Sequence, residues 1–446
     1  MPLHAAIVTK DLRIGAAIHA RIIEDVAALT CQQYPRVTVY GGRDFPDRDD
    51  AFDIYEGTRA VNKMGAHFAV FPEVEVTEHS PNRLPVAESG LPKFTPEMIA
   101  GIGRDTEVDG LVDAYADFIL EHIRNKHGEP RRAQIPENIE AQGRLDFEAT
   151  HYAANPARHA HGSVIIFGGQ GPEAGNDALV YLAERYPNIT VLLESRPGIA
   201  NPVEYYLAQQ NPELKQAANP IPELREEARK GDSLHFDSMG WMCVTINGPE
   251  IMPHLFHDDG GQPIAYKTPI INMVHEAVRM LPEDRPVIVM GTEATIAMQS
   301  FPKAAAELGL ERNFNAPSEE SQHQISAAIW EDIIPGNHSR ARGRLLQEME
   351  RNRAEHGQDT LHVLACTELS SAVGISWRGE SGRELPQAEN IVPGAVDTIQ
   401  IGADAMAAQA LRAAEERHLD AREIPSASGI TLREIEEKQP RARFAR

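Results

Sequence analysis

Short apolar runs rich in β-branched residues recur along this chain, and longer amphipathic stretches separate them. Such runs are found at 163–167, 189–193, 286–290 and 361–365. Strands that alternate with helices in this way form βαβ units, so the strands are parallel and the helices cover the sheet. The pattern therefore predicts an α/β fold with doubly wound, mostly parallel sheets. Because ligands of such folds bind at the carboxyl ends of the strands, the residues after each run are the candidates for a site.

The chain also contains an internal repeat. The matched segments keep the same order in both halves, and the second of the three matches has no gaps. The second and third matches are separated by about 30 residues in the first copy and by about 140 in the second, so we expect the second copy to contain an inserted lobe. The matches are 34–39 with 186–191, 64–79 with 239–254, and 108–109 with 396–397.

The repeat predicts two complete lobes preceded by an extra single lobe. A stretch with little apolar periodicity separates the two copies, which is typical of a linker. The charged C-terminal segment is expected to be peripheral. The expected segments are a degenerate single lobe (1–127), a linker (128–161), a first lobe (162–275) closed by a helix around 396–412, a second lobe (276–385) and a charged tail (416–446).

The composition argues against several classes of function. The formal net charge is −23, whereas a nucleic-acid surface needs clustered Lys and Arg. The sequence contains no run of about 18 apolar residues, so it predicts no membrane span. Residues 1–8 lack the features of a signal peptide. The three cysteines, Cys31, Cys243 and Cys366, cannot form a disulfide framework and suit a reducing compartment. We therefore expect a cytoplasmic protein that acts on a small molecule.

Two motifs after predicted strands point to anion binding. In the glycine-rich segment 168–174, Gly169 and Gln170 can bring backbone N–H groups close to an anion at a helix N-terminus. A plain strand-to-helix turn explains that segment equally well, and its spacing is not that of a dinucleotide-binding loop. Thr292 and Thr295 place two hydroxyls three residues apart at a helix start, although a helix N-cap explains Thr292 without any function.

A third motif contains a candidate catalytic thiol. Cys366 directly follows the apolar run 361–365, and Thr367 and Glu368 come next. A thiol at the end of a strand and near a helix N-terminus can have a lowered pKa. A lone cysteine is more often a small buried hydrophobe, but its position raises Cys366 above that base rate. We expect no cofactor, because no lysine has a pyridoxal-phosphate context and no His/Cys cluster has metal-ligand spacing.

Together these motifs resemble those of the aspartate/glutamate racemase superfamily, over roughly residues 161–412. Its members have two α/β lobes with motifs similar to GGMGPEAT, CNTAH, ATxGT and GCTE, in that order. The resemblance implies a cofactor-independent racemase or epimerase that uses cysteine acid/base chemistry at the α-carbon of a carboxylate or amino-acid substrate. The matching residues are 168–174 for the first motif, Thr292 and Thr295 for the third, and Cys366, Thr367 and Glu368 for the fourth.

The resemblance also implies how the extra lobe packs. Family members commonly pair through their first lobes, and the N-terminal copy looks like a first lobe without its partner lobe. Left alone, it would expose an apolar face. We therefore expect it to pack on the first lobe of the second copy and to form an internal pseudo-dimer. Whether whole chains also form a homo-oligomer stays open.

The first-thiol motif departs from the family pattern. The family's first thiol lies in CNTAH, and two interpretations of the matching segment compete. Either Cys243 is that thiol, or the strand runs from Trp241 through Ile246 and Cys243 is buried within it. We favour the second, because the N-terminal copy then aligns without gaps and Pro249 suits a first helical position. In that case Glu250 is the candidate base opposite Cys366.

The family's substrate-carboxylate arginine is also replaced, because Pro202 stands at its position. Arg196 can compensate, or Arg48 can reach across from the first copy, where 45–48 looks like the family's arginine segment. The candidate catalytic residues are Cys366, Cys243 and Glu250, and the candidate substrate-binding residues are Gly169, Gln170, Arg196, Asn247, Thr292, Thr295, Thr367 and Glu368.

Other functions stay open at this stage. A site with one thiol is typical of a single-cysteine decarboxylase or a cis–trans isomerase on the same scaffold. The missing thiol and arginine also fit a non-catalytic, carboxylate-binding paralogue. A nucleotide-binding oxidoreductase is a more distant alternative, since the glycine-rich segment lacks the dinucleotide spacing.

Overall fold

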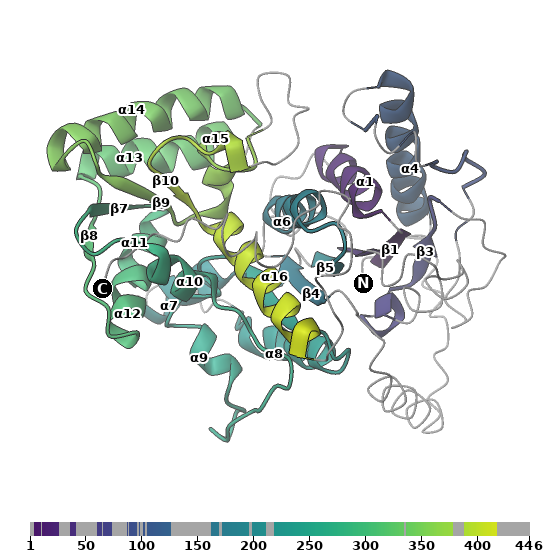
Figure 1. The fold of residues 1–446 in the computed structure, drawn as a ribbon, viewed down its shortest axis with the longest axis horizontal. Coiled ribbons are helices and arrows are strands. Elements are labelled where there is room, and N and C mark those ends of the chain that lie inside the picture. The colour runs from purple at the N-terminus through teal and green to yellow at the C-terminus, as the bar shows by residue number, and fades with distance from the viewer. Residues whose placement is uncertain are drawn as a thin grey trace.

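A computed structural model gives the arrangement of most of the chain. It forms two sheets with helices on both faces (Figure 1), which confirms the doubly wound α/β class. The expected linker lies outside the described residues, and so does the expected tail apart from Glu416. The described residues are 4–9, 11–25, 36–41, 60–64, 66–73, 87, 89–95, 98, 101–102, 105–125, 162–168, 172–195, 199–210, 218–333, 336–377 and 388–416.

The first sheet has six strands in the order β3-β1-β2-β5-β4-β6. It consists of two parallel blocks, because β1 pairs with β2 and β3, and β4 pairs with β5 and β6. An antiparallel pair between β2 and β5 joins the blocks. The strands are β1 (His4–Thr9), β2 (Arg36–Gly41), β3 (Phe68–Val70), β4 (Ser163–Gly168), β5 (Thr190–Ser195) and β6 (Ser238–Met242).

The pairing of β2 with β5 gives the sheet a local twofold character. One residue beyond the matched segments 34–39 and 186–191, Tyr40 and Leu192 are register partners across the antiparallel pair. Each block also has its first strand in the middle. At this contact the strands of the N-terminal segment and those of the first lobe belong to one sheet, and an internal pseudo-dimer of lobes stays a prediction. Main-chain pairing here covers the edge that β5 would otherwise expose.

Helices cover both faces of the first sheet. On one face α1 packs against α4 and α6, and α6 packs against α16 (Figure 1). On the other face Trp241 stacks on Phe167 with ring centroids 4.9 Å apart, and Leu224 of α8 belongs to the same core. The helices are α1 (Leu12–Asp25), α4 (Thr106–Asn125), α6 (Pro172–Arg185), α8 (Ile221–Asp232) and α16 (Thr398–Glu416).

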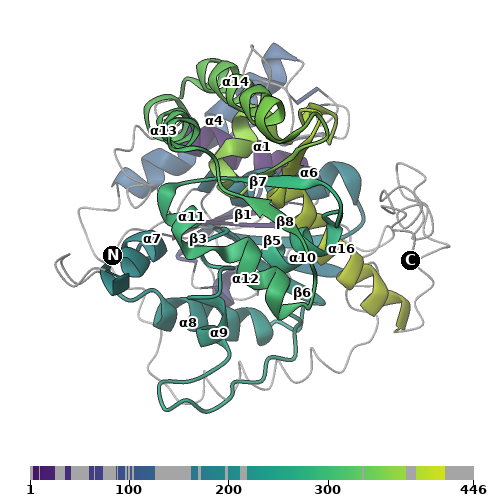
Figure 2. The ribbon, with the colours of Figure 1, turned by 90° about the vertical axis from the view of Figure 1, so that its left-hand side faces the viewer.

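The second sheet has four parallel strands in the order β10-β9-β7-β8, and helices lie on both of its sides (Figure 2). One core contains residues of α13 and α14, and the other contains residues of α10 and α12. The elements are β7 (Pro286–Met290), β8 (Asn313–Asn315), β9 (Leu361–Leu364), β10 (Ala395–Asp397), α10 (Met273–Met280), α12 (Ser300–Glu307), α13 (Glu319–Ala327) and α14 (His338–His356).

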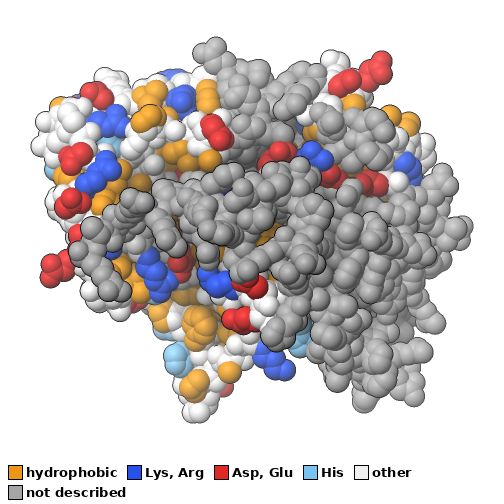
Figure 3. All heavy atoms as spheres, viewed as in Figure 1, with side chains coloured by type: hydrophobic (Ala, Val, Ile, Leu, Met, Phe, Trp, Pro, Cys, Tyr) orange, Lys and Arg blue, Asp and Glu red, His pale blue; other side chains and the backbone are white. Residues whose placement is uncertain are grey.

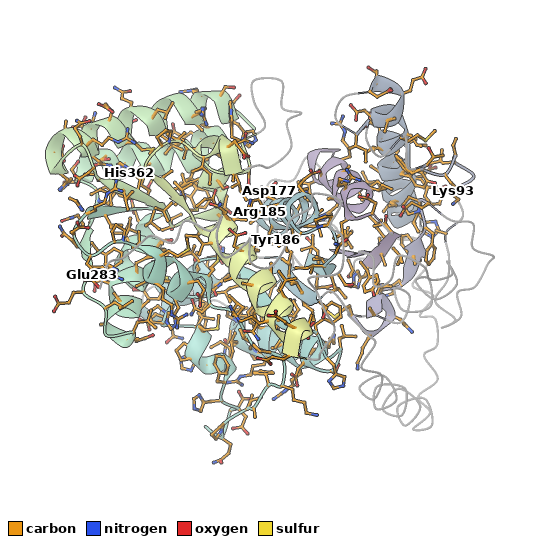
Figure 4. The ribbon with its side chains drawn as sticks, viewed as in Figure 1. Lys93, Asp177, Arg185, Tyr186, Glu283 and His362 are labelled. Atoms are coloured by element: carbon orange, nitrogen blue, oxygen red, sulfur yellow. The ribbon has the colours of Figure 1, made fainter. Side chains whose placement is uncertain are left out.

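After the second sheet the chain returns to the first sheet through α16. Asp404, buried in this helix, accepts hydrogen bonds from the Tyr186 hydroxyl at 2.7 Å and the Tyr181 hydroxyl at 3.0 Å. Arg185 lies 3.6 Å from the same carboxylate, and Arg185 and Tyr186 lie together beside α16 (Figure 4). Because buried polar groups need such partners, this cluster fixes α16 on α6.

The described surface carries charges of both signs. On the face shown in Figure 3, Lys and Arg side chains lie among Asp and Glu side chains and do not gather in one basic patch. No helix among the described residues combines the length and the apolar character needed to cross a membrane.

His19 makes the fold sensitive to acid. Its Nδ1 lies 3.1 Å from Asn176 Oδ1 between α1 and α6, and burial lowers the pKa of His19 to about 4. The ordinary pKa of histidine is 6.5. Burial of neutral His19 therefore does not lower the unfolding free energy above pH 6.5, but the unfolding free energy falls as the pH drops from 6.5 towards 4. We expect the unfolding free energy of His19→Leu to fall about 2 kcal/mol less than that of the unsubstituted protein between pH 7 and pH 5. Urea unfolding at both pH values measures this, and an equal fall in both proteins would contradict it.

Candidate active site

The two lobes meet where the turn after β6 lies against the helices after β7. A Cβ at Gly248 would lie 3.0 Å from Ser300 Oγ, and Glu250 forms a 2.6 Å ion pair with Lys303 Nζ. Further contacts across the lobes join α6 to the short helix η4 (Thr367–Leu369), and α7 (Pro202–Gln210) to α11 (Glu293–Met298). The strand ends that carry Cys243 and Cys366 therefore belong to one region between the lobes.

Cys243 follows the end of β6 and does not lie within the strand. The strand ends at Met242, and the chain turns from Val244 onward, so the expected strand through Ile246 is wrong. The ungapped match with the first copy is wrong for the same reason, because it places Phe68 of β3 opposite a residue outside β6. Pro249 lies in this turn and does not begin a helix; the next helix is α9 (Met252–Leu255).

Asn247 explains why the chain leaves the sheet at this point. Its amide group donates to Trp241 O at 2.8 Å and to Cys243 O at 2.9 Å, and its Oδ1 accepts from Met273 N at 3.0 Å. These bonds hold the turn together and tie it to the start of α10. Both amide hydrogens therefore form hydrogen bonds within the protein, and Asn247 holds the main chain of Cys243 in place.

Cys366 lies at the matching place in the second lobe. It is two residues beyond Leu364, the end of β9, and its main chain begins η4. Its thiol donates to Glu368 Oε2 at 2.8 Å, and the Thr367 hydroxyl lies 3.4 Å from the same oxygen. The Cys-Thr-Glu segment thus folds back on itself around one carboxylate, and both cysteines remain partly exposed.

Burial and the Glu368 carboxylate act on the pKa of both thiols, and Cys243 also acts on that of Cys366. Burial raises the pKa of the Cys366 thiol well above its usual range, and the Glu368 carboxylate and then Cys243 raise it further. Burial also raises the pKa of Cys243 to about 11, with Glu368 again contributing. The expected lowered pKa of Cys366 is therefore wrong. η4 is a three-residue 3-10 helix with a carboxylate beside the thiol, and this arrangement favours the protonated form.

Thr292 and Thr295 lie at the end of the neighbouring strand β7. Thr292 caps α11, because its Oγ1 accepts from Thr295 N, and the two hydroxyl oxygens are 3.0 Å apart. Gly291 connects this pair to the thiol segment, since a Cβ there would lie 3.2 Å from Thr295 Cβ and 3.3 Å from Ala365 O. The N-cap interpretation thus holds for Thr292. In the pair one hydroxyl hydrogen joins the two oxygens, and the other has no acceptor among the residues that the structure describes.

The remaining candidates have different positions. Glu250 is half-exposed and its carboxylate is paired with Lys303 of α12, which the sequence analysis did not single out. Pro202 begins α7 behind an Asn201 cap, as proline commonly does at a first helical position. Gly169, Gln170, Arg196 and Arg48 lie outside the described residues.

Sequence reasoning also missed Gln322 of α13, whose amide nitrogen donates to Gly291 O at 2.9 Å. Neither Lys303 nor Gln322 follows a strand or belongs to a motif, so only a search of helix faces opposite the strand ends could have found them. Within the described part of the chain, no group of three or more His, Cys, Asp and Glu side chains could hold a metal ion.

No family model and no curated protein matches this chain. Solved structures similar to it include an aspartate racemase from Picrophilus torridus, with 17% identity and a TM-score of 0.40 over 58% of this chain and 98% of that one. An aspartate racemase homologue from Pyrococcus horikoshii has 17% identity and a TM-score of 0.39 over 57% and 99%. A glutamate racemase from Francisella tularensis has 13% identity and a TM-score of 0.37 over 58% and 83%. Similarity at this level does not assign an activity to the chain.

Proposed function

We propose that this protein is a cofactor-independent amino-acid racemase or epimerase in which Cys243 and Cys366 form an acid/base pair. One observation carries the proposal: each lobe contributes a partly exposed thiol just beyond the end of a strand, and Cys243 raises the pKa of the Cys366 thiol. Racemisation needs proton transfer on both faces of the α-carbon, and a pair of thiols from opposite lobes can supply it.

In the proposed reaction one proton leaves one face of the α-carbon and another proton is added to the opposite face. One cysteine, as a thiolate, removes the α-proton, and the opposite thiol then donates its proton to the other face of the planar carbanion. Hydrogen-bond donors stabilise the charge that develops on the substrate carboxylate. The free hydroxyl hydrogen of the Thr292–Thr295 pair suits this role. From the family resemblance, Gly169, Gln170 and Arg196 are further candidates to bind the carboxylates.

Glu368 explains how a thiolate forms although both thiols have raised pKa values. The Cys366 thiol already donates to Glu368 Oε2, so this carboxylate is placed to accept the thiol proton. A substrate ammonium group near Glu368 offsets its negative charge, which removes part of the cause that disfavours a thiolate. The base then forms when an amino acid is bound, and the free protein keeps both thiols protonated.

The test is a chirality assay in heavy water. Purified protein, treated with a chelator and free of absorbance near 420 nm, is incubated with each enantiomer of aspartate, glutamate and other amino acids. We expect the opposite enantiomer to accumulate with one deuterium at the α-carbon. Carbon dioxide release from a substituted malonate, with a product of one handedness, would indicate a single-cysteine decarboxylase instead. No exchange across the panel would favour a non-catalytic binding protein.

Replacing Glu368 should separate thiol reactivity from turnover. Because Glu368 raises the pKa of both thiols, Glu368→Gln should lower both pKa values and speed alkylation of both cysteines by iodoacetamide several-fold at pH 8. Turnover should fall about 100-fold, since the acceptor of the Cys366 proton is lost. Peptide-resolved mass spectrometry follows alkylation, with Glu250→Gln as the matched carboxylate control. Slower alkylation in Glu368→Gln would contradict this role.

A further inference from the structure

The side chain of Gln322 has one polar atom without a hydrogen-bond partner among the described residues. Its Oε1 is buried and has no hydrogen-bond partner among the described residues, although the side chain as a whole is partly exposed. A buried acceptor without a partner is unfavourable, because it has lost its hydrogen bonds to water and gained none in the protein. Such a cost at the edge of a candidate site suggests that a ligand supplies the missing donor.

The orientation of the Gln322 amide is fixed by its other end. Nε2 donates to Gly291 O at 2.9 Å and to Ser326 Oγ at 3.2 Å. Turning the amide over would place the oxygen against the Gly291 carbonyl, which cannot donate. Oε1 is therefore held as an acceptor, and both amide hydrogens are engaged.

The position of this amide connects it to the proposed reaction. Gly291 directly precedes Thr292. The Cα of Gly291 lies close to Thr295 and to Ala365, which is the residue before Cys366. Gln322 thus reaches from α13 to Gly291 in the turn after β7, and Gly291 in turn lies beside the end of β9. A carbonyl oxygen cannot bind a carboxylate, but it suits the N–H donors of an ammonium group.

We propose that Gln322 is a substrate-binding residue whose Oε1 accepts a hydrogen bond from the α-ammonium group of the amino acid at the thiol site. The proposal rests on the proposed function for the place of the substrate, and it adds how the site separates α-amino acids from carboxylates that lack the amine. An analogue without the amine leaves this buried oxygen without a partner, and sites of this kind reject such analogues strongly.

The test compares ligands that differ only in the amine. Isothermal titration at pH 7 measures binding of L-aspartate against succinate and of L-glutamate against glutarate. We expect the unsubstituted protein to prefer the amino acid of at least one pair, and Gln322→Met to reduce that preference about tenfold. Gln324→Met is the matched control, because Gln324 is on the same helix and its Oε1 already accepts from Arg344 at 2.9 Å. This control should keep the preference.

A second variant keeps the test informative if Gln322→Met does not fold. Gln322→Lys retains a donor for Gly291 O but has no acceptor, so it should also reduce the preference for the amine. Equal weakening of both ligands in Gln322→Met, or no binding of either amino acid to the unsubstituted protein, would overturn the proposal. The first of these results would mean that only a buried water uses Oε1. An intact preference for the amine without any racemisation would instead overturn the proposed function alone.

Discussion

Replacing either Cys243 or Cys366 with alanine is expected to lower racemisation about 1,000-fold, because each change removes the acid/base group on one face of the α-carbon. Turnover is measured by chiral chromatography after circular dichroism has shown that the variant is folded. Cys31→Ala, which changes the third cysteine of the chain, is the control for loss of a thiol elsewhere. Near-normal turnover in either single variant, with folding intact, would contradict the two-thiol mechanism.

Isotope exchange separates the two thiols further. In heavy water the thiol that remains can exchange the α-proton of only one enantiomer, so the two variants should label opposite enantiomers. If Cys243→Ala keeps its turnover and Glu250→Gln abolishes turnover, Glu250 is the second base. The ion pair between Glu250 and Lys303 makes that outcome unexpected, since the carboxylate is already engaged.

Gly374→Ala is expected to cause a large loss of stability, about 3 kcal/mol or more. A Cβ at Gly374 would lie 1.9 Å from Asp397 Oδ2 and 2.6 Å from Ser370 Oγ, at the end of α15 (Ser370–Val373). Asp397 is buried and accepts from Ile375 N at 2.8 Å and from Ser370 Oγ at 2.5 Å. The added methyl group would break this connection between the thiol segment and the start of α16.

Thermal and urea unfolding measure the effect, and Gly343→Ala is the matched control. Gly343 lies inside α14 and a Cβ there would meet nothing within 4 Å, so that change should stabilise the protein by about 0.5–1 kcal/mol. Gly374→Ala should also lower turnover, because η4 and α15 follow Cys366 directly. A Gly374→Ala protein as stable as the unsubstituted one would show that the turn around Asp397 can open without cost.

Much of the fold could be predicted from the sequence because its signals are local. The alternation of β-branched runs and amphipathic stretches predicts parallel sheets, and strands form at each of the four apolar runs. The second lobe-one-like unit that the repeat predicts stays a prediction, although β2 and β5, which follow the matched tyrosines Tyr34 and Tyr186, pair with each other. Cys366 was found for the same reason, since the apolar run before it shows where β9 ends.

The tertiary structure decided the features that depend on distant partners. The end of β6, and with it the position of Cys243, depends on Asn247 binding the main chain of Met273, 26 residues away. Glu250 is engaged by Lys303, 53 residues away, and Gln322 reaches Gly291 from another helix. The raised pKa of Cys366 comes from burial and from the way Glu368 folds back onto the thiol. The sequence by itself determined which segments enter the sheets, because burial periodicity is local; only the tertiary structure decided where the chain leaves them and which charges meet, because those contacts join residues far apart in the chain.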